Sequence, residues 1–128
     1  MKPPVLLMYS LRGEMAKKVR LVAMRFRIRV RPVAPWEYED PLGALVDGQK
    51  SPPPEKPGTE FEEAMLVMGF FPAGMMDAFL RGLQRAGVPP ISLKAVLTPT
   101  NLQWNSCKLR EELSREREAF QKGAPPAH

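Results

Sequence analysis

The residues whose types and spacing could support chemistry are densest in "SLKAVLTPTNLQWN", residues 92–105. Two threonine hydroxyls, an asparagine amide and an indole follow an apolar strand there, and strand ends in α/β proteins often form ligand crevices. One hypothesis is a ligand site made by Lys94, Thr98, Thr100, Asn101 and Trp104. The alternative is structural, because the same hydroxyls and amide can bond the backbone and hold a turn before the last helix.

A second candidate site follows the two apolar runs "VLLMYSL" (5–11) and "AMLVMGFF" (64–71), which are typical of strands buried on both faces. If both strands are central, their ends can receive a partner. The function that we favour is a noncatalytic binding or regulatory module for an unknown protein or small molecule. Its candidate residues are Tyr9, Ser10, Arg12, Gly69 and Phe70.

An arginine stripe provides an alternative function. "RFRIRVRP" (25–32) alternates basic and apolar residues, and residues 1–34 carry a net charge of +8 against −6 for residues 35–64. Nucleic acid is a possible partner, but three interpretations stay open: a solvated sheet edge, a polyanion site, and pairing with the acidic block at 37–63. The solvated edge is the one we favour. The residues concerned are Arg25, Arg27, Arg29 and Arg31.

Several chemistries lack their residues. Cys107 is the only cysteine and His128 the only histidine, so a Cys/His metal site or a Ser-His or Cys-His pair is not expected. Neither apolar strand is followed by a glycine-rich phosphate loop. We therefore expect no metal and no cofactor, and we favour a noncatalytic protein over an enzyme. A small enzyme with a polar site at the "TPTN" turn is kept as a further alternative.

Length and composition predict one small domain. The chain has 128 residues, 44% of them hydrophobic and 26% charged, which is enough for one core. There is no secretory pattern, and no apolar run approaches the roughly 20 residues that span a bilayer. The expected location is cytoplasmic, without membrane association.

The two halves of the chain repeat the same order of elements. After each apolar strand comes a helix, at about 13–24 and about 72–86, and then an amphipathic strand, within 25–32 and at 91–97. Each half closes with a helix, a short one within 36–46 and a long one at 105–120, the latter capped by Asn105 or Ser106. The sequence therefore predicts two βαβα halves, 1–46 and 64–122. Between them lies a flexible Pro/Gly-rich linker, 47–63, and residues 123–128 form a disordered tail.

We expect one four-stranded α/β sheet with the apolar strands central and helices on both faces. The favoured arrangement is parallel, with strand order 2-1-3-4, because helices on both sides would explain why "LLM" and "LVM" have no polar face. The alternative is a ferredoxin-like α+β sheet of order 4-1-3-2.

The segments "AMLVMGFF", "MMDAFLRGLQRAGVP" and above all "SLKAVLTPTNLQWN" resemble a bacterial family known as domain of unknown function 3783. The resemblance covers about residues 64–121, and "RPVAPWEYEDPLG" is similar to the family's N-terminal portion. No activity comes with it. The signature positions that it implies are Lys94, Thr98, Pro99, Thr100, Asn101 and Trp104.

Overall fold

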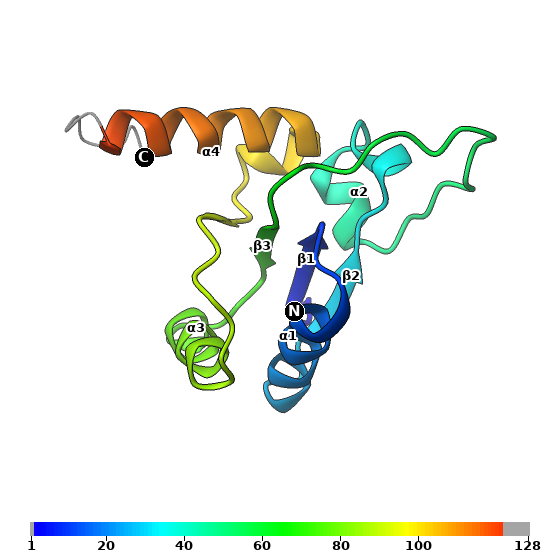
Figure 1. Cartoon of the computed structure of the whole chain (residues 1–128). Coiled ribbons are helices and arrows are strands. Elements are labelled where there is room, and N and C mark those ends of the chain that lie inside the picture. Colours follow the sequence, from blue (N-terminus) through cyan, green and yellow to red (C-terminus); the bar gives the residue numbers. More distant parts are fainter. Residues whose placement is uncertain (1, 122–128) are drawn as a thin grey trace.

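The computed structural model describes residues 2–121, which form three layers (Figure 1). The middle layer is one sheet of order β2-β1-β3-β4. Its strands are β1 (Val5–Tyr9), β2 (Arg29–Pro32), β3 (Met65–Gly69) and β4 (Leu93–Val96). The helices are α1 (Gly13–Arg25), α2 (Leu42–Val46), α3 (Met75–Arg85) and α4 (Ser106–Gln121), with short 3₁₀ turns at Pro35–Glu37 and Asn101–Gln103. The tail predicted at 123–128 lies outside the described residues.

The predicted strand order 2-1-3-4 is confirmed, but the predicted all-parallel sheet is wrong at its centre. β1 and β3 pair antiparallel, whereas β1 with β2 and β3 with β4 are parallel. Strands that are apolar on both faces require cover on both faces, and either direction of β3 satisfies that requirement. The long segment between α2 and β3 can deliver the chain to either end of the sheet, so burial alone did not fix the direction.

The two halves of the chain are related by an approximate two-fold axis that passes through the sheet. Leu7 of β1 lies opposite its counterpart Val67 of β3. Ser10 and Phe70, sixty positions apart, both have a positive φ, of 58° and 60°. On the α2/α4 side, Pro41 forms an antiparallel bridge with Asn105. The two halves are therefore copies of one unit that face each other across the central strand pair.

Alternation along the central strands divides the apolar side chains between two cores. Leu6, Met8, Leu66 and Met68 pack with α1 and α3 in one core, around Val19 and Phe79. Val5, Leu7, Tyr9, Met65 and Val67 pack with α2 and α4 in the other, around Leu45 and Leu109. The predicted helices on both faces are thus present, as Figure 1 shows with α1 and α3 below the sheet and α2 and α4 above it.

The predicted stripe of four arginines on one strand is wrong. α1 continues to Arg25, and Arg27 occupies a left-handed turn with φ 57°. The Ile28 N–H donates to the carbonyl of Ala23 at 2.9 Å, so the residues up to 28 are needed to close the helix. Only Arg29 and Arg31 lie on β2.

Arg31 pairs with the acidic block, which was one of the open interpretations. Its guanidinium donates to both carboxylate oxygens of Glu37, at 3.1 and 2.6 Å, and to the carbonyls of Pro32 and Gln49. Glu37 also accepts from the backbone N–H of Ala34 at 3.1 Å. Both side chains are buried, at 10% and 5% exposure. Such a pair needs hydrogen bonds to offset its desolvation, and both terminal nitrogens of the guanidinium make them, whereas the buried Nε of Arg31 has no partner among the described residues.

The segment between α2 and β3 carries no helix or strand, and residues 47–59 are exposed. Its end is anchored by an aromatic cluster, in which Phe61 stacks on Tyr38 with ring centroids 4.0 Å apart and lies 5.9 Å from Tyr9. The buried hydroxyl of Tyr9 shares a 2.6 Å hydrogen bond with Ser106 at the start of α4. The segment therefore returns to the core just before β3 begins.

Arg31→Ala should lower the free energy of unfolding by about 3–5 kcal/mol, because the buried Glu37 carboxylate loses its partner. Arg29→Ala is the matched control, since Arg29 lies on the same strand but is exposed and makes one hydrogen bond, to the carbonyl of Val46. The control should cost about 1 kcal/mol. Urea denaturation of both variants measures the difference, and equal losses would contradict a buried pair.

The buried pair also predicts a pH dependence. Burial alone raises the pKa of Glu37, but the bonds from Arg31 and Ala34 outweigh it, so the pKa lies below its ordinary value of 4.5. The carboxylate therefore contributes stability that is complete above pH 4.5 and is lost as the pH falls through the lowered pKa. Glu37→Gln should be less stable than wild type at pH 7, and the gap should narrow below pH 4.5. Denaturant titrations at pH 7 and pH 3 measure this gap, which would stay constant if the carboxylate did not titrate.

Candidate functional site

The side chain of Asn101 is fully used within the "TPTN" turn. Its Oδ1 accepts from the backbone N–H of Thr98 at 2.7 Å, and its Nδ2 donates to the carbonyl of Val96 at 3.0 Å. The Asn101 N–H donates to the Thr98 hydroxyl at 3.1 Å. Asn101 is buried while Thr98 and Thr100 are exposed. The turn is therefore held by the bonds that the structural interpretation expected, and both polar atoms of the Asn101 side chain take part in them.

These bonds place the Asn101 amide where a neighbouring strand would lie. Leu97 donates its N–H to Met68 of β3, so the backbone of Leu97 faces the sheet interior while Val96 and Thr98 face outward. One residue of an added strand would bond the carbonyl of Val96 and the N–H of Thr98. The Asn101 side chain makes both of these bonds instead. The unpaired part of the β4 edge therefore ends before the Val96 carbonyl.

The rest of the β4 edge stays open. In the parallel register Leu66↔Lys94 and Met68↔Val96, alternate residues of β4 point their backbone groups away from β3. The outward groups are the N–H and carbonyl of Lys94 and the N–H of Val96. No hydrogen bond from within residues 2–121 reaches them. An unpaired row of this kind is a template for another extended chain.

Hollows flank this edge on both faces of the sheet. A cavity of about 160 Å³ lies on the α3 side and is almost wholly apolar. A groove of about 440 Å³ lies on the α4 side. Lys94 borders both, and its ammonium turns back to the carbonyl of Ile91. The cavity is lined by Leu66, Leu80, Leu83, Val88, Pro90 and Ile91, and the groove by Ala95, Val96, Trp104, Leu109, Glu112 and Glu116.

Acidic and aromatic groups line the groove, and Glu112 is already paired with Lys108 at 3.3 Å and with Arg115 at 3.1 Å. Glu112 and Glu116 line it from α4, and Trp104 closes one end, with the Lys108 ammonium 5.4 Å from the indole. The Asn105 side chain caps α4, as predicted, by accepting from the Lys108 N–H at 2.8 Å. Arg117 pairs with Glu63 at 2.7 Å and donates to Ser92 at 2.9 Å. These contacts fix the helix that forms the groove wall.

The equivalent edge at β2 is partly blocked, because only Val30 keeps an outward N–H there. Pro32 occupies the position that corresponds to Val96, so it has no N–H, and its carbonyl accepts from Arg31. The hollows beside β2 are lined by basic side chains, Arg20 and Arg27 on one face and Arg29, Arg31 and Lys50 on the other. Proline and charge are the usual means of protecting a sheet edge. The same fold thus has one protected edge and one open edge.

The candidate residues at the two central strand ends cannot form one site. Because β1 and β3 are antiparallel, Val5 lies opposite Gly69 and Tyr9 opposite Met65. The C-terminal ends of the two strands therefore lie at opposite ends of the central pair. Near Tyr9, Ser10 donates to the carbonyl of Phe61 at 2.8 Å, and Arg12 donates to Glu60 at 3.2 Å. Burial raises the pKa of the Tyr9 hydroxyl. These groups hold residues 60–61 in place.

Sequence reasoning placed the strand within 91–97 at a sheet edge and found Lys94, Thr98, Thr100, Asn101 and Trp104, which lie around the groove, but it did not identify the unpaired backbone of that edge as a site. Val96, with 46% of its surface exposed, and the cavity lining on α3 were not candidates. A signal was present in the comparison of "RVRP" with "LKAV", because the second strand lacks both the proline and the arginines of the first.

Other chemistry finds little support within the described residues. Burial raises the pKa of the Cys107 thiol, and the nearby carboxylate of Glu39 adds to the effect. Across residues 2–121 no group of three His, Cys, Asp or Glu side chains is placed to hold a metal. In the same range no helix has the length and apolar character needed to cross a membrane.

The fold and edge define a three-layer α/β domain made of two facing βαβα halves. Residues 64–120 match the model of the family described as Domain of unknown function (DUF3783), so the C-terminal half carries a domain of this family. The match covers β3, α3, β4 and most of α4, which together form the open edge and its two hollows. No curated protein and no solved structure matches the chain.

Asn101→Ala should lower the free energy of unfolding by about 2–3 kcal/mol, because the Val96 carbonyl and the Thr98 N–H both lose their partner. Thr100→Ala, at an exposed neighbouring position, should change it by less than about 0.5 kcal/mol. Thermal and urea unfolding of both variants measure the effect. Equal stability of the two variants would show that Asn101 does not hold the turn.

Proposed function

We propose that this protein is a peptide-binding module that receives an extended segment of a partner protein along β4. The observation that carries the proposal is the open edge at Lys94 and Val96, with a hollow on each face. Strand addition supplies main-chain hydrogen bonds for affinity, while pockets for alternate side chains supply specificity. The proposal makes the favoured binding function more specific.

The two hollows describe the peptide. Successive residues of a strand point to opposite faces, so one side chain enters the cavity beside α3 and the next enters the groove beside α4. The apolar cavity of about 160 Å³ suits an aliphatic side chain. The Lys108 ammonium lies beside Trp104 and Glu112 of the groove, and the groove suits a Lys or Arg of the peptide that takes the place of this cation. The expected motif therefore alternates an aliphatic with a basic residue.

A second copy of this chain fits the edge less well. In antiparallel pairing of β4 with itself, the side chain nearest the groove would be Ala95, which is too small to fill about 440 Å³. Lys94 would in turn bring an ammonium to the apolar cavity of the other copy. A peptide with larger and alternating side chains fills both hollows.

Val96→Pro should weaken peptide binding while leaving the fold intact. It removes the outward N–H, and Pro32 already occupies the equivalent position in β2. The stability change should stay within about 1 kcal/mol. Linear peptides selected on wild-type protein from a phage-displayed random library are then titrated against both proteins by fluorescence anisotropy. Binding should weaken at least about tenfold, the loss of roughly one to two hydrogen bonds.

Val96→Ala is the control, because it shortens the side chain but keeps the N–H, and it should retain most of the binding. Amide hydrogen exchange at Lys94 and Val96 should slow when peptide is added to wild type. Peptides that bind Val96→Pro as tightly as wild type would refute strand addition. Self-association through β4 with no enriched peptide would also refute it.

A further inference from the structure

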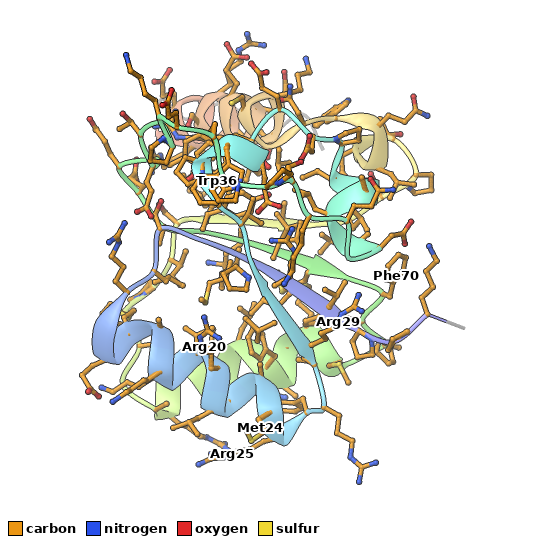
Figure 2. All side chains as sticks on the ribbon, turned by 90° about the vertical axis from the view of Figure 1, so that its right-hand side faces the viewer. Arg20, Met24, Arg25, Arg29, Trp36 and Phe70 are labelled. Carbon is orange, nitrogen blue, oxygen red and sulfur yellow. The ribbon has the colours of Figure 1, made fainter. Side chains whose placement is uncertain are left out.

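The excess positive charge of the chain lies on one layer. Residues 13–27 and 75–85, which hold α1, its exit turn and α3, carry seven Lys and Arg but only Glu14 and Asp77 as acids. The basic residues in these two ranges exceed the acidic ones by five, which equals the net charge of the whole chain, +5. The rest of the chain therefore carries equal numbers of basic and acidic residues. This basic layer is opposite α2 and α4, and Figure 2 shows Arg20 and Arg25 along α1 on that side. Its cations are Lys17, Lys18, Arg20, Arg25, Arg27, Arg81 and Arg85.

The cations of the basic layer are not used by the fold. Of the seven, only Lys17 has an ion pair within residues 2–121, a 3.7 Å contact with the exposed Glu14. Outside this layer some arginines are paired with carboxylates, as Arg31 is with Glu37 and Arg117 with Glu63, while Lys50 and Lys56 have no such pair among the described residues. What distinguishes the basic layer is that six cations without a carboxylate partner in the described part of the chain gather on α1, its exit turn and α3, where their charge is available to an external anion.

Three of these arginines surround a groove between α1 and α3. The groove has a volume of about 380 Å³, and Arg25, Arg81 and Arg85 stand at its rim. The helices approach closely at its floor, where a Cβ on Gly82 would lie 2.9 Å from the Cγ1 of Val22. Arg25 and Arg85 are sixty positions apart, so the approximate two-fold axis places one guanidinium from each half at the same groove. A planar guanidinium can bind phosphate through two parallel hydrogen bonds.

We propose that the groove between α1 and α3 binds the phosphate backbone of a nucleic acid. Its contacts are the guanidinium groups of Arg25, Arg81 and Arg85, with Arg20 and Arg27 extending the basic surface toward β2. The polar side chains that line the groove are those of Arg25, Arg81 and Arg85, and their partners in this proposal are phosphate oxygens, which carry no base sequence information. Arg29 and Arg31 of the original stripe take no part, because β2 uses them in the protected edge.

An anionic membrane is the competing partner, and the apolar side chains argue against it. Insertion into a bilayer interface needs apolar side chains along the contacting face. The large exposed apolar residues of this layer, among those described, are Leu21 and Met24, both on α1. α3 presents Arg81 and Arg85 and no such residue. The charges span both helices, which suits a phosphate chain lying across the groove.

The test replaces Arg25, Arg81 and Arg85 by Glu and measures binding by fluorescence anisotropy. The probes are a labelled single-stranded RNA and a labelled DNA duplex, at several salt concentrations. At 50 mM salt the triple variant should bind at least about tenfold more weakly than wild type. The slope of log affinity against log salt should become shallower by about 2–3, because three phosphate contacts are lost.

The control is Lys50→Glu, Lys56→Glu and Arg115→Glu, which changes the net charge equally but lies outside the basic layer. All six positions are exposed, and thermal unfolding checks that both variants are folded. The control should retain binding and the wild-type salt slope. Equal losses in the two variants would overturn the proposal. Binding to phosphatidylcholine vesicles containing phosphatidylserine, without binding to either nucleic acid, would also overturn it.

Discussion

The antiparallel pairing of β1 with β3 is the constraint on which the rest of the structure depends. Both strands are buried on both faces, so they must lie side by side and be covered twice. With Leu7 opposite Val67, the two halves are related by a two-fold axis, which puts α1 with α3 on one face and α2 with α4 on the other. It also makes β2 and β4 the two equivalent edges.

β2 and β4 have equivalent backbones but different side chains, and these side chains decide how far each edge is protected. Glu37 and Asn101 each accept from the backbone N–H three residues earlier, at Ala34 and Thr98. Glu37 holds Arg31 against the carbonyl of Pro32, whereas Asn101 bonds the carbonyl of Val96 directly. Because Val96 keeps its N–H, the edge of β4 has an unpaired donor at the position where Pro32 of β2 has none. The open edge and the basic layer lie on different surfaces, so the two proposed partners do not compete for one site.

Local patterns were sufficient for much of the fold and for part of the candidate site. Period-two and period-3.6 alternation identified the strands and helices, and the proline and asparagine of "TPTN" identified the turn. The arginine stripe failed because alternation in "RFRIRV" also fits a helix end followed by a left-handed turn at Arg27. The position of this strand at a sheet edge was predicted, but the unpaired N–H of Val96 was not, because which backbone groups face outward depends on the register with β3 and on the bonds that Asn101 makes.

The sequence by itself determined that two similar βαβα halves exist, that their first strands are central, and that Cys/His metal chemistry lacks its residues. Tertiary structure decided the direction of β3, the burial of Arg31 and the gathering of Arg25, Arg81 and Arg85 at one groove. The physical reason is that an apolar strand must be buried wherever it lies, so its central position follows from its own residues. Strand direction, edge pairing and charge placement depend on contacts between segments far apart in the chain.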